Sequence, residues 1–295
     1  MRVHHLNCIS SCPLGGRLFD GRSQGLRGKL ACHCLLVETE SELVLIDTGF
    51  GLRDVHEPKQ RLSTFFLALL HPDFREELTA VRQIEELGYS ARDVRHIVLT
   101  HLDFDHAGGL DDFPDAKIHM LIDEAEDAAR QRTWLDRQRY RPQQWSSVDR
   151  WIGYEATRGD TWFGFDTVRD LRGVSQRILM LPLVGHTHGH AGIAIREDAG
   201  WLLFAGDAYF DHDEMDVDNP RCTPGLRAYQ WMMDKNRRLR LANQQRLRDL
   251  KRDHGHEVRV MCSHDPRELE AAAGHPLDIP ARSAAHTGAQ PPAQL

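Results

Sequence analysis

The feature of this sequence that most constrains its fold and chemistry is a dense run of metal-binding residue types after a short apolar segment. Residues 96–100 predict a buried strand, and residues 101–109 are His-Leu-Asp-Phe-Asp-His-Ala-Gly-Gly. Because alternate residues of an extended segment lie on one side, the polar side chains of this run can point together while the apolar ones enter the core. Imidazole and carboxylate groups at this density suit two ions of zinc, iron or manganese. The candidate ligands in the run are His101, Asp103, Asp105 and His106.

An apolar strand that ends at a histidine or aspartate beside a small residue recurs later in the chain. His186 follows the predicted strand 178–184, Asp207 follows 201–205, and His264 follows 258–262. A single histidine at a strand end is more often structural than a ligand. The recurrence of the pattern in one chain therefore indicates strand ends that meet at a common metal site.

Taken in order, these motifs and Leu-Ile-Asp-Thr-Gly at 45–49 resemble the metallo-β-lactamase superfamily, most closely its lactonase and glyoxalase II-like branches. The resemblance covers most of the chain. It implies an α/β fold, a four-layer αβ/βα sandwich of two mixed β-sheets flanked by helices, with two divalent metal ions at the edge where the sheets meet. It further implies a first ion held by His101, Asp103 and His186, a second held by Asp105, His106 and His264, and Asp207 as the bridge.

Asp103 departs from the family's usual motif, His-x-His-x-Asp-His, in which a second histidine stands at this position. The added carboxylate, with the other two aspartates and a bridging hydroxide, would cancel the charge of two dications, whereas the usual site keeps one positive charge. We therefore expect weaker attraction of anionic substrates and a less acidic metal-bound water. Zinc is the expected metal, with iron or manganese as alternatives. Another possibility is that Asp103 does not ligate and the site holds one ion.

The expected chemistry is hydrolysis, because a hydroxide between two metals is a nucleophile at neutral pH and a metal polarises the substrate carbonyl. Asp105 is the candidate for carrying a proton to the leaving group. Tyr209 is a candidate donor to the developing oxyanion, although the lactonases that resemble this region place a tyrosine one position later. Asp47 is expected either to orient a metal ligand from outside the coordination sphere or to have only a local role in the Asp-Thr-Gly turn. We expect His190 to be structural and His188 to be exposed.

The leading functional hypothesis is a hydrolase that opens an ester or lactone, with acyl homoserine lactones as one candidate class. A glyoxalase II-type thioester hydrolase is an alternative, but a glutathione thioester would need a basic groove, and no paired lysine or arginine stands near the ligand motifs. A carboxylate at position 103 also occurs in the superfamily's di-iron oxygen and nitric-oxide reductases, so a di-iron redox enzyme stays open. Nucleic-acid cleavage with the basic helix expected over 224–253 is a third alternative, although a solvated helix face is favoured.

Composition and segment patterns set the remaining expectations. The formal net charge of −7 argues against nucleic-acid and membrane partners and leaves a small-molecule substrate. No apolar run is long enough to span a bilayer or to resemble a signal peptide, so we expect a cytoplasmic protein. Residues 1–274 are expected to form the hydrolase domain, and 275–295 a disordered tail. Oligomeric state is left open.

Several segments carry further expectations. Apolar spacing predicts helices over 61–70 and 76–87, and a polar helix over 123–132. Residues 134–170 are expected to be irregular, and the tryptophan-rich part, 134–162, could join 62–70 in an apolar cap over the metals. The cysteines are expected to be buried or half-buried thiols, with a structural metal site as the alternative for four of them: Cys8, Cys12, Cys32 and Cys34.

Overall fold

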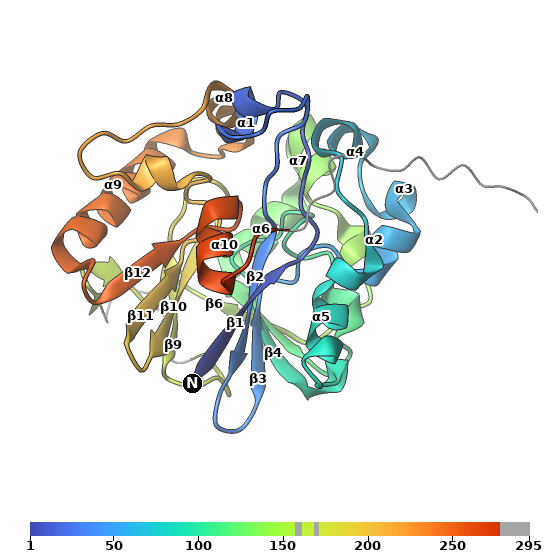
Figure 1. The fold of residues 1–295 in the computed structure, drawn as a ribbon. Coiled ribbons are helices and arrows are strands. Elements are labelled where there is room, and N and C mark those ends of the chain that lie inside the picture. Colours follow the sequence, from blue (N-terminus) through green and yellow to red (C-terminus); the bar gives the residue numbers. More distant parts are fainter. Residues whose placement is uncertain (157–160, 168–170, 278–295) are drawn as a thin grey trace, which may run out of the picture.

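Two mixed β-sheets face each other in the computed structural model, which describes residues 1–156, 161–167 and 171–277 (Figure 1). The larger sheet has the spatial order β1 (Arg2–Asn7), β2 (His33–Glu38), β3 (Leu43–Ile46), β4 (Val94–Val98), β5 (Lys117–Leu121) and β6 (Trp151–Tyr154). The smaller sheet has the order β12 (Val258–Met261), β11 (Gly200–Phe204), β10 (Ala191–Glu197) and β9 (Ile178–Pro182). A short hairpin pairs β7 (Thr161–Trp162) with β8 (Phe165–Asp166).

Helices cover the outer faces of the sheets and gather above one edge (Figure 1). The α-helices are α1 (Arg17–Asp20), α2 (Leu52–His56), α3 (Pro58–Arg61), α4 (Thr64–Leu70), α5 (Ala80–Glu86), α6 (Ile122–Arg130), α7 (Trp134–Arg139), α8 (Pro224–Met233), α9 (Arg237–His254) and α10 (Pro266–Ala273). The 3₁₀ turns are η1 (Glu76–Leu78), η2 (Ala91–Asp93), η3 (Leu110–Asp112), η4 (Pro142–Gln144) and η5 (His212–Met215).

Apolar packing explains why the chain forms four layers. Ile46 of β3 and Ile193 of β10 belong to the cluster that fills the space between the two sheets. Ile84 of α5 packs on the outer face of the larger sheet, and Leu247 of α9 packs on the outer face of the smaller one. The expected four-layer αβ/βα sandwich is therefore confirmed.

The prediction that residues 134–170 are irregular was wrong for the described part of this segment, which contains α7, β6 and the β7–β8 hairpin; residues 157–160 and 168–170 lie outside the described residues. α7 begins after Thr133, whose side chain forms a capping box with Asp136. β6 pairs in parallel with β5 at the edge of the larger sheet. Both elements are short, so the sequence shows too few repeats of the helical or strand pattern to predict them. The capping box determines α7, and pairing with β5 determines β6.

The single long helix expected over 224–253 is in fact two helices. Between them, the backbone N–H groups of Lys235 and Asn236 donate to the carbonyls of His186, at 3.1 Å, and Gly185, at 2.8 Å. The Asn236 side chain then caps the first turn of α9. Hydrogen bonding to the distant 185–186 loop thus interrupts a segment that has helical spacing throughout.

Smaller differences concern element boundaries. The helix expected over 61–70 is split into α3 and α4, because Ser63 caps α4. The helix expected over 76–87 starts as the 3₁₀ turn η1. α10 was not expected; it begins at Pro266 and is capped by the Asp265 side chain.

The end of the chain leaves one expectation open. Most of the tail expected to be disordered, residues 278–295, lies outside the described residues. Among the helices of the described residues, none combines the length and the apolar character needed to cross a membrane.

Two buried histidines lie side by side on the larger sheet. His96 Nδ1 and His119 Nε2 are 2.7 Å apart, and His119 Nδ1 is 2.8 Å from the Tyr154 hydroxyl. Burial is the main cause that lowers the pKa of His96 to about 4 and that of His119 to about 3, and nearby positive charge such as Lys117 adds to it. Both rings therefore stay neutral in the folded protein at pH values that protonate them in the unfolded chain.

We expect the free energy of unfolding to fall as the pH is lowered from 6.5 towards about 4, because only the unfolded chain takes up these protons. In a His119→Gln variant the fall should be shallower, as measured by urea denaturation at several pH values. His256→Gln, at an exposed position, is the control and should keep the wild-type pH dependence. Parallel curves for wild type and His119→Gln would contradict this prediction.

Candidate metal centre

The candidate ligands converge from four chain segments at one edge of the two sheets. Backbone hydrogen bonds join the segments: Ala191 N–H donates to Thr100 O at 2.9 Å, and Ala31 N–H donates to His264 O at 3.1 Å. All of the candidate ligands are buried. They are the 101–106 loop after β4, His186 after β9, Asp207 after β11 and His264 after β12.

One group of ligand atoms forms around Asp103. Its Oδ2 lies 3.0 Å from His186 Nε2 and 3.4 Å from His101 Nε2. Asp207 Oδ2 lies 3.4 Å from His186 Nε2 and 3.8 Å from His101 Nε2. Two atoms bound to one tetrahedral zinc-sized ion stand about 3.3–3.6 Å apart, so the spacing suits an ion at the centre of this group.

A second group lies beside the first and shares Asp207 with it. Asp105 Oδ1 is 3.8 Å from His106 Nε2, and its Oδ2 is 3.8 Å from His264 Nε2. Asp207 Oδ1 is 3.4 Å from His106 Nε2, and its Oδ2 is 3.1 Å from His264 Nε2. The structure thus brings together every residue of the sequence-predicted ligand set, with Asp207 between the two groups.

Unpartnered polar atoms mark the same place. Within the described part of the chain, the buried atoms His101 Nε2, His106 Nε2 and Asp207 Oδ1 have no hydrogen-bond partner. A buried polar group left in this way costs about 1–3 kcal/mol. Divalent ions would satisfy these atoms, so the residues present fit a metal centre.

Hydrogen bonds on the far side of the imidazoles aim the ligand nitrogens. Asp47 Oδ2 accepts from His106 Nδ1 at 2.8 Å, and its carboxylate also binds Thr100 through the backbone N–H and the hydroxyl. His264 Nδ1 donates to the Ala31 carbonyl at 2.8 Å. Each contact fixes a ring with Nε2 towards the site. Asp47 therefore occupies the orienting position expected for it.

Glu124 of α6 holds two loops of candidate ligands together, a role that was not predicted from the sequence. Its carboxylate accepts from the Leu102 N–H at 2.9 Å, from the Thr187 hydroxyl at 2.5 Å and from the Gly189 N–H at 3.1 Å. Burial raises the pKa of Glu124 to about 7. The one signal for this role in the sequence was an acidic residue within a predicted helix.

Arg139 of α7 is the most consequential residue that the sequence did not reveal. It is fully buried, and its Nε and Nη2 donate to Asp103 Oδ1 and Oδ2 at 2.6 and 2.5 Å. Although burial alone would raise the pKa of Asp103, the Arg139 charge holds it well below its ordinary value. The charge count made from the sequence omitted this guanidinium, which returns the one positive charge that Asp103 removes.

Arg139 also affects the first group of ligands directly. Its Nη2 lies 3.0 Å from His186 Nε2, the atom that His186 would offer to an ion. One lone pair cannot accept an N–H and bind a cation at the same time. An ion in the first group therefore requires Arg139 to give up its contact with His186. No such donor contacts the second group within the described residues.

The structure separates the remaining candidates. It does not bring Tyr209 to the ligands, because the phenol packs in the cluster under α9 and donates to Glu268 at 2.8 Å. His190 lies beneath the site: it accepts from the Asp207 N–H at 2.9 Å and donates to the Leu183 carbonyl. His188 is exposed, as expected.

An apolar cap made by α4, α8 and two loops covers the ligands. Phe66 of α4 contacts Phe104 in the ligand loop, with ring centroids 4.6 Å apart. Phe210 stacks on His264 at 4.8 Å and contacts Tyr229 of α8 at 5.8 Å. α4, within the segment 62–70, thus lies where a cap was expected.

The tryptophans expected in the cap are dispersed. Trp134 contacts Phe65 of α4 at a ring distance of 5.0 Å. Trp145 and Trp151 instead pack against the cluster on the larger sheet, and Trp162 packs in the cluster on the smaller one. Among the described residues of the 134–162 segment, only those at its start therefore reach the cap.

Tyr229 of α8 is a phenol close to the candidate ligands, because its ring contacts Phe210, which stacks on His264. It is buried in the apolar cap, and its hydroxyl has no hydrogen-bond partner within the described residues. Burial first, and then the charges of Asp105, Asp103 and Asp207, raise the pKa of Tyr229 well above its ordinary value. Its phenol is thus held protonated near all three carboxylates.

The cysteines are free thiols, and four of the six are buried. Among the described residues, no potential metal-binding group contains a cysteine. Cys32 contacts the 101–106 loop, because its Sγ lies 3.1 Å from the backbone carbonyl oxygen of Asp105.

Comparison with known proteins gives consistent matches. Residues 27–260 match the sequence model of the Metallo-beta-lactamase superfamily. The chain is 38% identical over 266 residues to a "Probable metallo-hydrolase" of Mycobacterium tuberculosis, covering 90% of this chain and 81% of the relative. It is 29% identical over 193 residues to an N-acyl homoserine lactonase of Bacillus cereus, covering 65% and 69%.

Solved structures share the fold. An N-acyl homoserine lactone hydrolase with N-hexanoyl-L-homoserine bound at its metal centre aligns with a TM-score of 0.68 at 21% identity, over 91% of this chain and 95% of that one. A probable metal-dependent hydrolase from Staphylococcus aureus aligns with a TM-score of 0.66 at 18% identity, over 90% and 89%.

We expect Arg139→Gln to lower the free energy of unfolding by about 3–5 kcal/mol, because it leaves the buried Asp103 carboxylate without its counter-charge. Urea denaturation measures the loss. Arg137→Gln, an exposed change on the same helix, is the control and should stay within about 0.5 kcal/mol of wild type. The double variant Asp103→Asn/Arg139→Gln should recover most of the loss; a double variant as unstable as Arg139→Gln would show that charge pairing is not the cause.

Proposed function

We propose a specific reaction for this chain, which belongs to the metallo-beta-lactamase superfamily: the metal-dependent opening of a lactone, or cleavage of an ester, with an apolar acyl group. The observation that carries the proposal is a buried double group of metal ligands directly under an apolar cap. Acyl homoserine lactones are the candidate substrate class, which the lactonase relatives support.

The proposed centre holds two divalent ions, with zinc as the expected metal and iron or manganese as alternatives. When bound, the ions would supply an ionised water as the nucleophile and would polarise the substrate carbonyl. The ions are expected to bind unequally, because Arg139 approaches His186 in the first group, whereas among the described residues no such donor approaches the second.

The apolar cap favours a substrate with an acyl chain rather than a substrate with a charged group at this position. Phe66, Phe210 and Tyr229 present rings beside the ligands, and burial of each CH₂ group contributes about 0.8 kcal/mol to binding. Arg139 does not form a basic groove for a glutathione thioester, because its guanidinium is bonded to Asp103 and the Met233 carbonyl. The structure of the cap therefore favours the ester or lactone over the thioester.

Two side chains are proposed to act on the reacting atoms. Asp105 has no side-chain hydrogen bond within the described residues, and burial raises its pKa, so its free oxygen carries the proton to the leaving group. Tyr229 donates its hydroxyl hydrogen to the developing oxyanion. It takes the role that the sequence suggested for Tyr209, whose hydroxyl is bonded to Glu268.

The substrate assignment is tested with purified protein whose metal content is measured by mass spectrometry. We expect kcat/KM for acyl homoserine lactones to rise with acyl length, by up to about fourfold per buried CH₂. It should exceed kcat/KM for a glutathione thioester by about tenfold or more. Protein treated with a chelator is the control and should lose both activities. Faster turnover of the thioester, or no lactone hydrolysis by metal-loaded protein, would contradict the proposal.

The Tyr229 assignment is tested by Tyr229→Phe, which removes the hydroxyl and keeps the ring. We expect kcat on the best lactone to fall by about 10²-fold with KM little changed, because an oxyanion donor acts in the transition state. Tyr209→Phe, measured in the same way, shows which of the two tyrosines is the oxyanion donor. A loss of kcat at Tyr209 that equals or exceeds the loss at Tyr229 would overturn the assignment.

A further inference from the structure

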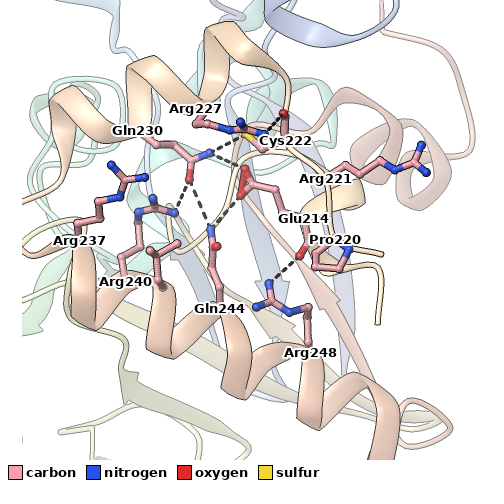
Figure 2. A pocket seen from close by; sticks show the side chains of 11 residues that line it. Glu214, Pro220, Arg221, Cys222, Arg227, Gln230, Arg237, Arg240, Gln244 and Arg248 are labelled. Atoms are coloured by element: carbon pink, nitrogen blue, oxygen red, sulfur yellow. Dashed lines mark hydrogen bonds between the residues drawn. The ribbon is translucent and has the colours of Figure 1, made fainter. Parts of the chain in front are cut away.

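A polar cavity lies outside the metal site, between α8, α9 and the segment before α8. Its volume is about 170 Å³. Figure 2 shows Arg227 and Gln230 extending from α8, and Arg240, Gln244 and Arg248 from α9 below them. Five arginines line it: Arg221, Arg227, Arg237, Arg240 and Arg248.

Hydrogen bonds fix the buried floor of this arginine cavity. Gln230 Nε2 donates to Glu214 Oε1 at 2.5 Å, and Gln244 Nε2 donates to Glu214 Oε2 at 2.9 Å (Figure 2). Arg240 donates to Gln230 Oε1 at 2.6 Å and to Asp234 Oδ1 at 2.6 Å. The Glu214 carboxylate is thus engaged by two amides rather than by the arginines around it.

Four of the five arginines of the cavity form no close ion pair with a carboxylate among the described residues. Within the described residues, no ion pair joins Arg221, Arg227 or Arg237 to a carboxylate, in contrast to Arg240. Arg248 donates to the Glu214 backbone carbonyl at 3.0 Å and likewise has no ion pair there. In a chain with a net charge of −7, these guanidinium groups create a local positive potential.

We propose that the arginine cavity binds a small polyanion of the phosphate type, either a free diphosphate or the phosphoryl end of a larger metabolite. Planar guanidinium groups bind phosphate oxygens through paired hydrogen bonds. Several unpaired arginines match an anion with two or more charges better than a single carboxylate. The volume of about 170 Å³ is below the roughly 300 Å³ at which pockets for drug-sized ligands begin, so the cavity suits the anionic group alone.

The proposal does not depend on the reaction at the metal centre. It also differs from nucleic-acid binding, because the arginines surround one cavity rather than line an extended strip. A nucleic acid would engage exposed arginines of α9 outside the cavity, such as Arg238, to a similar extent.

Isothermal titration of the metal-loaded protein with inorganic diphosphate tests the site. We expect saturable binding to one site per chain that weakens steeply with added salt. Arg227→Gln/Arg237→Gln removes two exposed guanidinium groups of the cavity and should weaken binding by about tenfold or more. Arg238→Gln is the control: it removes one positive charge on α9 outside the lining, and it should change affinity by less than about threefold.

The other probes identify the anion and its source. Similar affinities for diphosphate and ADP would support a free anion, whereas tighter binding of ADP would support a phosphorylated metabolite; both agree with the proposal. Tighter binding of citrate than of diphosphate would overturn the phosphate assignment. Absence of diphosphate binding, binding unchanged in Arg227→Gln/Arg237→Gln, or equal losses in that variant and in Arg238→Gln would overturn the site itself.

Discussion

The burial of carboxylates and imidazoles at the common edge of two sheets is the constraint on which the rest of this structure depends. Removing charged groups from water costs several kcal/mol each unless other charges and hydrogen bonds compensate. The fold supplies that compensation around the ligands, through Asp47 behind His106 and Glu124 between two loops. The atoms still without partners point into the site, where divalent ions would satisfy them. The protein interior therefore leaves some atoms of these carboxylates and imidazoles without a partner from the protein itself.

Asp103 shows how one substitution in a motif requires a second change elsewhere. A carboxylate in place of the family's usual histidine adds a buried negative charge, and Arg139 brings a positive charge to it from a different helix. The pair restores the net charge of the centre, so the weaker attraction of anions expected from Asp103 alone does not follow. Because Arg139 also approaches His186, the same pairing makes the two groups of ligands unequal.

α8 contributes residues both to the apolar cap over the candidate metal centre and to the arginine cavity. One of its faces places Tyr229 in the apolar cap, and another places Arg227 and Gln230 in the arginine cavity. The residues that follow it hydrogen-bond to the His186 loop before α9 begins. A segment that has helical spacing throughout therefore acts as two helices, and the break between them positions a ligand loop.

The sequence by itself determined the fold class, the strands that precede the candidate ligands and the residues that the structure brings together at the candidate metal centre. These follow from local patterns: apolar strands that end in histidine or aspartate, in an order typical of one family. The sequence could not determine the partners that the ligands would meet. Arg139 is 36 residues from Asp103 in a segment without clear periodicity. Tyr209 was the candidate phenol in the sequence, but packing places its hydroxyl against Glu268 and brings Tyr229 within range of the charges of the three carboxylates. Only the tertiary structure decides which distant charges and hydroxyl groups share a low-dielectric interior, since Coulomb energy and desolvation depend on distances in space rather than on separation along the chain.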